Sequence, residues 1–228
     1  MFFAALRRRL IDFAANSRAI AAVEFALVLP LLVLILLGGS ETSRMLAFQR
    51  HVINYTNGMA FDLAGSTSQI TAAQMYNMTT QMGILVPELA DGEYAWPATF
   101  AANNRFMVGF TMVVMTPTVA GCINNCTYTA NVAWSWGAMP RPCGVLTSAS
   151  NTASYSATTL PAGAFQPGAV MVVDVQAVYP VTFASRFMTG FTLVRSAYYP
   201  VRNYTAGVYP PTDNFTYWWT GAKCNGYP

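Results

Sequence analysis

"AIAAVEFALVLPLLVLILLGG", residues 19–39, is a continuous apolar run that contains one acid, Glu24, and one proline, Pro30. As a helix this stretch would be about 30 Å long, the thickness of the hydrocarbon core of a bilayer. Each Leu, Ile, Val or Phe favours insertion by roughly 0.3 to 0.6 kcal/mol, whereas a charge at the centre of a span costs about 2.5 to 3.5 kcal/mol. Because Glu24 lies near the start of the run, the apolar residues outweigh it. The sequence therefore predicts a transmembrane helix.

Basic residues gather before the apolar run, at Arg7, Arg8, Arg9 and Arg18. The positive-inside rule then places the N-terminus in the cytoplasm and the rest of the chain outside. We expect a cytoplasmic basic leader (1–18), a transmembrane helix (19–39) and an extracytoplasmic domain (40–228). A cleaved secretory signal is the first competing interpretation. Such signals are about 15–30 residues long, and this one would end only near residue 40.

The helical pattern continues past the apolar run. Between residues 40 and 64, apolar side chains recur every three or four positions, which is the spacing of one helix face. They are Met45, Phe48, Val52, Tyr55, Met59 and Leu63. No proline interrupts the pattern before Pro87, so we expect the transmembrane helix to continue into an amphipathic helix.

The composition describes the rest of the chain as one neutral, polar domain. Of 228 residues, 54% are hydrophobic and only 9% are charged, against about 25% charged in an average soluble domain. The net charge of +3 owes much to the arginines before the apolar run. The body has no basic field that would bind nucleic acid. The length suits a single modest domain and an anchor, without a second domain.

A second helix is expected over about 72–84. Thr71 and Gln74 have the spacing of a capping box at its start, and Pro87 follows its end. Its apolar face would comprise Ala72, Met75, Met78 or Thr79, and Met82.

Four strands are expected after the second helix, at 105–116 (ending before Pro117), 127–137, 168–183 and 189–202. In the second strand, Val132, Trp134 and Trp136 alternate with Ala133 and Ser135. In the third, Met171, Val173, Val175, Ala177 and Tyr179 share one face, and Asp174 and Gln176 lie on the other. This period of two is typical of half-buried strands.

The expected fold is α+β: a long N-terminal helix, a short second helix and a four-stranded antiparallel sheet. Helices on one face of an antiparallel meander form a stable two-layer arrangement. Residues 144–167, rich in Ser, Thr and Ala, are too long for a simple connector. We interpret them as a loop that is either a partner-contact surface or a disordered insertion.

The four cysteines, Cys122, Cys126, Cys143 and Cys224, all follow the apolar run. An even number on one side of a membrane favours disulfides in an oxidising compartment. Zinc is the alternative, but a CxxxC pair with two single cysteines fits the spacing of zinc sites poorly. Because Cys122 and Cys126 lie at the tip of the expected hairpin, the geometry favours Cys122–Cys126 and Cys143–Cys224. The sequence by itself permits three pairings.

Catalytic sets are missing from the sequence. The one histidine, His51, falls on the expected helix, and no Ser-His-Asp set, G-x-S-x-G or phosphate loop occurs. Glu88, Asp91 and Glu93 cluster in one stretch, which we interpret as a solvated acidic loop and not a metal site. We expect no enzyme activity, cofactor or metal.

The motif "RAIAAVEFALVLPLLVLILLG" (18–38) resembles the N-terminus of the TadE-like family, the minor pseudopilins of Tad-type pilus systems. The likeness is nearly word for word over residues 21–30. A weaker likeness of pattern follows near the C-terminus, in the last two expected strands. The resemblance implies a pilin-like fold, a bacterial inner-membrane location with the body in the periplasm or in a pilus, and other pilus or pseudopilin subunits as partners.

The resemblance also implies roles for individual residues. In pilin-like proteins a prepilin peptidase cuts before the apolar segment and the acid is the fifth mature residue, which places the cut between Ala19 and Ile20. Glu24, with Phe25 and Pro30, would then dock the subunit, its carboxylate meeting the new α-amino group of a neighbour. The usual leader residue of the family is Gly, and this chain has Ala19.

Two other functions stay open on the sequence. If the leader is retained, the chain is an uncleaved single-pass envelope protein with an extracytoplasmic ligand- or surface-binding domain. An extracytoplasmic enzyme with an unfamiliar site is the third interpretation.

Overall fold

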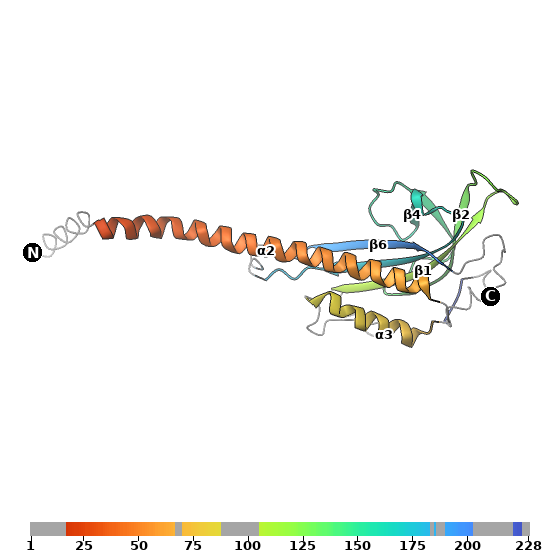
Figure 1. Ribbon diagram of the computed structural model, residues 1–228, viewed down its shortest axis with the longest axis horizontal. Coiled ribbons are helices and arrows are strands. Elements are labelled where there is room, and N and C mark those ends of the chain that lie inside the picture. The colour runs from red at the N-terminus through yellow and green to blue at the C-terminus, as the bar shows by residue number, and fades with distance from the viewer. Residues whose placement is uncertain are drawn as a thin grey trace, which may run out of the picture. The chain divides into compact units, whose positions relative to one another are not determined.

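The computed structural model describes residues 17–66, 70–87, 105–182, 185, 190–202 and 221–224. Within these residues the chain is α+β, with two α-helices and a six-stranded sheet (Figure 1). It divides into two compact units, 1–46 with 181–188, and 47–180 with 189–228. The α+β class with a long N-terminal helix is confirmed, whereas the predicted number of four strands is wrong.

The first helix, α2 (Ser17–Gly65), is a single helix of 49 residues that includes Pro30, and Figure 1 draws it without a break. After Gly38 and Gly39, the hydroxyls of Ser40 and Thr42 donate to backbone carbonyls three and four residues earlier. The expectation that the apolar helix continues into an amphipathic one is confirmed.

The amphipathic part of α2 packs against the sheet. Its expected apolar residues from Phe48 onward are fully buried: Phe48, Val52, Tyr55, Met59 and Leu63. The ring centroids of Phe48 and Tyr179 lie 5.3 Å apart, and those of Tyr55 and Phe106 lie 5.1 Å apart. Helical periodicity thus predicted the face of α2 that joins the core.

The second helix, α3 (Ala72–Met82), continues into a 3-10 turn, η1 (Gly83–Leu85). Its capping box is confirmed, because the Thr71 amide donates to Gln74 Oε1 at 2.8 Å and the Gln74 amide donates to Thr71 Oγ1 at 3.2 Å. Met75 and Thr79 are buried, but Ala72 is exposed. The side chain of Met82 lies outside the described ones, so the described buried face contains Met75 and Thr79 and does not include Ala72.

The sheet has the order β4-β3-β2-β1-β5-β6. Four strands match the predicted ones: β1 (Phe106–Pro117), β2 (Tyr128–Gly137), β5 (Gly168–Val178) and β6 (Thr192–Pro200). The expected meander is wrong, because β5 pairs with β1 and not with its predecessor β2. The chain between β2 and β5 is long enough to return across the sheet to β1.

The two additional strands are β3 (Val145–Ala149) and β4 (Thr159–Pro161), both in the segment that was expected to be a loop. β3 is antiparallel to β2, whereas β3 and β4 are parallel. A 3-10 turn, η3 (Ala162–Ala164), follows. The interpretation of 144–167 as a loop, and of the sheet as purely antiparallel, is corrected by these strands.

A β-bulge interrupts the pairing of β1 with β2. Met112 pairs with Trp134, but the next residue, Val113, pairs with Val132, so Ala133 is an extra residue on β2. One extra residue reverses the alternation of faces. Val132 therefore joins the cluster opposite the helices, and its predicted place on the same face as Trp134 is wrong.

The sheet buries residues on both faces. The face away from α2 carries its own apolar cluster, to which β3 and β4 contribute Leu146 and Leu160. The other members from the sheet are Val113, Met115, Ala130, Val132, Val170 and Val172. The segment between β2 and β5 is thus a cover for this second face.

Candidate functional site

The first part of α2 presents apolar side chains to its surroundings. Every described side chain from residue 21 to residue 40 is exposed, including Leu27 (75%) and Leu36 (71%). A continuous apolar surface of this extent marks a membrane or partner contact. The described chain has one helix that is long and apolar enough to cross a membrane.

The predicted docking residues lie on this exposed part. Glu24, Phe25 and Pro30 are all exposed, Phe25 by 60%. Pro30 lacks an N–H and cannot donate the helical hydrogen bond to the carbonyl of Ala26. The helix therefore offers one carboxylate and one backbone acceptor within an otherwise apolar surface.

The predicted processing site and the one histidine both lie on α2. Ala19 and Ile20 lie within the first turns of α2. His51 is half-buried on the same helix. The acidic stretch of Glu88, Asp91 and Glu93 lies outside the described residues.

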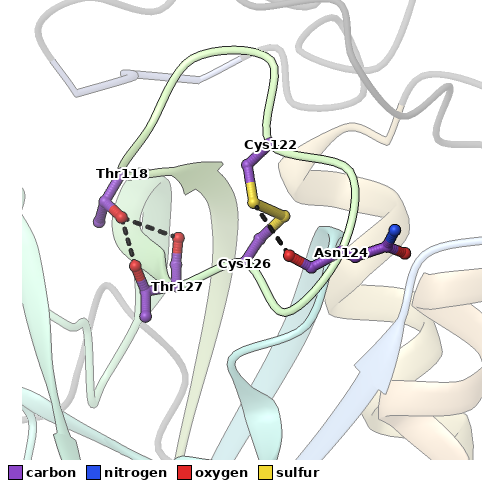
Figure 2. Close-up of a disulfide and its surroundings, with 5 residues drawn as sticks. All are labelled: Thr118, Cys122, Asn124, Cys126 and Thr127. Carbon is purple, nitrogen blue, oxygen red and sulfur yellow. Dashed lines mark hydrogen bonds between the residues drawn. A yellow bond between two sulfur atoms is a disulfide. The ribbon is translucent and has the colours of Figure 1, made fainter.

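The Cys122–Cys126 disulfide closes the tip of the β1–β2 hairpin. At the neck of this loop, the Thr118 amide donates to the Thr127 carbonyl at 2.9 Å, and the two threonine hydroxyls also hydrogen-bond (Figure 2). Asn125 adopts a positive φ of 52°, a conformation that Asn tolerates better than most residues. The tip is thus held by hydrogen bonds as well as by the disulfide.

The Cys143–Cys224 disulfide joins the β2–β3 connection to the C-terminal segment. Cys224 is buried in the cluster on the second face, and its amide donates to the carbonyl of the bulged residue Ala133 at 2.8 Å. Both bridges have the pairing that the hairpin geometry favoured, so the disulfide prediction is confirmed.

A buried ion pair joins the cover segment to the sheet. Arg141 and Asp174 form two parallel hydrogen bonds, Nε to Oδ2 at 2.7 Å and Nη2 to Oδ1 at 2.9 Å, and both side chains are fully buried. The remaining guanidinium nitrogen, Nη1, donates to the carbonyls of Thr159 at 2.6 Å and Ser156 at 3.2 Å. Ser196 Oγ donates to Asp174 Oδ1 at 2.5 Å. The pair therefore connects β5, β6 and the chain around β4.

A glycine makes room for this arrangement. Gly109 on β1 pairs with both Gly137 and Asp174, and a Cβ at this position would overlap the carbonyl oxygen of Met139. Only Gly allows such a close backbone approach. The segment that follows β2 can therefore pass over β1 at Gly109, which brings Arg141 within hydrogen-bonding distance of Asp174.

The charges of this cluster shift the titration of its members. Burial by itself lowers the pKa of Arg141, but the hydrogen bond and the charge of Asp174 outweigh it and raise the pKa above its ordinary value. Tyr155 lies with its ring 5.5 Å from the Arg141 guanidinium carbon. Desolvation first, and then the Asp174 charge, raises the pKa of Tyr155 to about 12.

Sequence reasoning missed this cluster, because it treated Asp174 as a residue of a polar face. The alternation of faces along β5 is as predicted, but the second face is covered and Asp174 is buried. One signal was available: Asp174 stands in the apolar run MVVDVQ, and a buried carboxylate requires a partner. Nothing local in the sequence pointed to Arg141 as that partner.

The apolar part of α2 is consistent with a single-pass membrane protein. Residues 19–57 match the model of a family described as TadE-like protein. The resemblance of this segment to TadE-like proteins is therefore confirmed. No curated protein and no solved structure matches the chain. The match lies wholly within α2, so the role of the sheet has to be argued from its own geometry.

Proposed function

We propose that this protein is a TadE-like minor pseudopilin or pilus-assembly component, which docks through its apolar helix with other pilus subunits in the bacterial inner membrane. One observation carries the proposal: the TadE-like match begins on the apolar part of α2 that contains Glu24, where every described side chain from residue 21 to residue 40 is exposed. The later part of the matched segment packs on the sheet. The exposed part is thus available to a membrane and to other helices.

Glu24 is the polar element of this docking. A carboxylate in a low-dielectric environment is costly unless it is paired. Removal of the leader between Ala19 and Ile20 by a prepilin peptidase would create an α-amino group four residues before it. The amino group of one subunit and the Glu24 carboxylate of its neighbour would then neutralise each other, with Phe25 and Pro30 shaping the contact.

The body of the protein would lie on the opposite side of the membrane from the leader, in the periplasm. Two disulfides support an oxidising compartment, and the arginines before the helix support a cytoplasmic N-terminus. The proposed role has no catalytic step and needs no cofactor, because docking requires only packing and charge neutralisation.

Substitution of Glu24 tests the docking role. We expect Glu24→Gln to leave membrane insertion unchanged and to reduce co-purification with pilus subunits on the order of tenfold, the effect of about 1.4 kcal/mol. Glu41→Gln, which alters the next acid along the same helix, is the matched control and should co-purify like the wild type. Co-purification of Glu24→Gln at the wild-type level would exclude a docking role for Glu24.

N-terminal sequencing of the membrane-extracted protein tests the processing step separately. A first residue of Ile20 is the expected result, because it supplies the amino group that pairs with Glu24. A first residue of Met1 would show that the leader is retained and would overturn the amine–carboxylate pairing. The chain would then be a fixed anchor, either with an extracytoplasmic binding domain or as an unprocessed pilus-assembly factor.

A further inference from the structure

A pocket of about 610 Å³ lies between the cover segment and the edge strand β6. One wall is the chain from Ala149 to Ser156 with Thr159 and Pro161, and the other is β6. This volume is within the range of about 300 to 1,000 Å³ that is typical of small-molecule sites. It is large enough for a ligand of one or two rings.

The lining of the pocket is polar but almost without charge. It contains hydroxyl groups, one amide and two phenol rings: Ser150, Asn151, Thr152, Ser154, Tyr155, Ser156, Thr159, Thr192, Ser196 and Tyr198. Among the described residues, no acid lines it, and Arg195 is the one basic residue of the lining. Ser196 faces Asp174 on the covered side of the sheet, so its neighbour Arg195 is directed to the opposite face by strand alternation.

The two walls are held in place by the buried ion pair. Arg141 Nη1 fixes the carbonyls of Ser156 and Thr159 on one wall. Its partner Asp174 fixes Ser196 on the other wall. A wall that is ordered before binding loses less entropy when a ligand arrives. The ion pair therefore preorganises the pocket, and its charged groups are hydrogen-bonded within the protein.

Tyr155, one of the residues that line the pocket, supplies an uncharged phenol. A tyrosine hydroxyl group keeps its proton at physiological pH, because even its ordinary pKa is about 10, so the group can donate a hydrogen bond. The phenol ring of Tyr155, like that of Tyr198, also offers an apolar surface.

The chemistry of the lining selects among ligand classes. Phosphate and carboxylate ligands are usually bound by Arg or Lys clusters, and cationic ligands by acids or aromatic cages. A purely apolar ligand would leave the hydroxyl groups without hydrogen bonds. A saccharide has many neutral hydroxyl groups that both donate and accept, and its C–H faces pack on aromatic rings. We propose that this pocket binds a short neutral saccharide.

Binding of saccharide probes to the full-length protein tests the proposal. The protein is embedded in lipid nanodiscs, because glycosidic detergents would compete for the site. The probes are glucose, galactose, mannose, maltose and lactose, with galacturonic acid and glucosamine as charged counterparts. Saturation-transfer NMR detects binding, and titration calorimetry measures it. We expect at least one neutral probe to bind with a dissociation constant of 10 mM or below, on the order of the weakest affinities that calorimetry can follow.

A pocket-filling variant and a matched control locate the binding site. Ser154→Trp places a large ring on the exposed wall of the pocket and should weaken binding at least tenfold. Ser148 is also exposed but lies on β3 outside the lining, so Ser148→Trp should bind like the wild type. Tyr155→Phe keeps the ring and removes the hydroxyl group, and should weaken binding several-fold. Melting temperatures close to that of the wild type would show that the variants are folded.

Three results would overturn the proposal: no neutral probe binds at 10 mM, only the charged probes bind, or Ser154→Trp binds as tightly as the wild type. Binding of an extended peptide along β6, blocked by Ser154→Trp when no saccharide binds, would also overturn it in favour of strand addition. The proposal is independent of pilus docking. Glu24→Gln should therefore retain saccharide binding in full.

Discussion

Burial of Asp174 and Arg141 as separate charges would destabilise the fold, whereas their interaction with each other offsets that cost. Each charge loses its hydration on burial, at a cost of several kcal/mol, and their mutual attraction offsets this only with good geometry and further hydrogen bonds. The pair meets both conditions, through its two parallel hydrogen bonds and through bonds to Ser196, Ser156 and Thr159. Its contribution is to fix the cover segment on the second face of the sheet.

Removing one partner should therefore be much worse than removing both. We expect Arg141→Met to lower the free energy of unfolding by about 3 to 5 kcal/mol, because Asp174 is left buried and unpaired. The double variant Arg141→Met with Asp174→Leu should regain a large part of that loss. Chemical denaturation of the three proteins measures both effects. A loss below about 1 kcal/mol for Arg141→Met would contradict a structural role for the pair.

Tyr155 makes the stability of the body depend on pH at the alkaline end. Its pKa is about 12 in the folded protein against an ordinary 10.0, so the unfolded chain releases the proton first as the pH rises. The contribution is therefore complete below pH 10 and is lost as the pH rises through about 12. Tyr155→Phe should show a smaller fall in denaturation midpoint over this range.

The tyrosinate absorbance provides the direct check of that shift. The chain has 12 tyrosines, so the wild-type titration has to be compared with that of Tyr155→Phe. The difference curve should have its midpoint near pH 12. A midpoint near pH 10 would mean that Tyr155 is solvated and is not held against the ion pair.

The sequence predicted the helices and strands whose apolar residues recur at a regular spacing. The buried stripe of α2, the capping box of α3, the hairpin of β1 and β2, and the strands β5 and β6 follow from spacing and turn residues. The strands β3 and β4 are short, with five and three residues, and are rich in Ser, Thr and Pro. Their burial comes from Leu146 and Leu160 alone, which is too little for a recognisable pattern.

Contacts between residues far apart in the chain could not be predicted from the spacing of residue types. The pairing of β5 with β1, the extra residue Ala133 and the meeting of Arg141 with Asp174 each depend on residues far apart in the chain. Gly109 illustrates the difficulty, since a glycine in a strand indicates a bulge or a close approach without saying which segment approaches. The docking residues of α2 came instead from a resemblance. A partner-contact surface was one of two interpretations of residues 144–167, but no pattern in that segment indicated a pocket against β6.

The two disulfides should contribute unequally to stability. The Cys122–Cys126 bridge closes a separation of four residues, whereas Cys143–Cys224 closes one of 81. By the loop-entropy relation, these correspond to roughly 2 and roughly 4 to 5 kcal/mol. We expect the Cys143→Ala, Cys224→Ala variant to lose more than twice as much unfolding free energy as Cys122→Ala, Cys126→Ala.

The local surroundings of the two bridges strengthen the contrast. The tip keeps the hydrogen bonds between Thr118 and Thr127 without its disulfide, whereas loss of Cys224 removes an anchor of the C-terminal segment in the second core. Denaturation of the two double variants is the measurement. Equal losses would show that the long loop is restrained in the unfolded chain by other means.

At the scale of the whole molecule, one helix has two different surroundings. The apolar part of α2 is exposed along its length, and the amphipathic part has its stripe in the core of the α+β body. The TadE-like match includes residues of both parts. A subunit that is anchored and docked by the same element would connect contacts in the membrane to the folded body through that helix.

The proposed orientation can be tested with the cysteines of the molecule as an internal control. All four are paired in disulfides, so none is a free thiol, and the wild type should not react with a membrane-impermeant maleimide. Ile84 is 79% exposed, and Ile84→Cys supplies one reactive thiol on the body. In spheroplasts with an intact inner membrane, we expect Ile84→Cys to be labelled as fully as after permeabilisation. Labelling only after permeabilisation would place the body in the cytoplasm and would reverse the orientation on which helix docking depends. Labelling of the wild type without permeabilisation would instead show that its cysteines are reduced, and would contradict the disulfides while leaving the orientation in place.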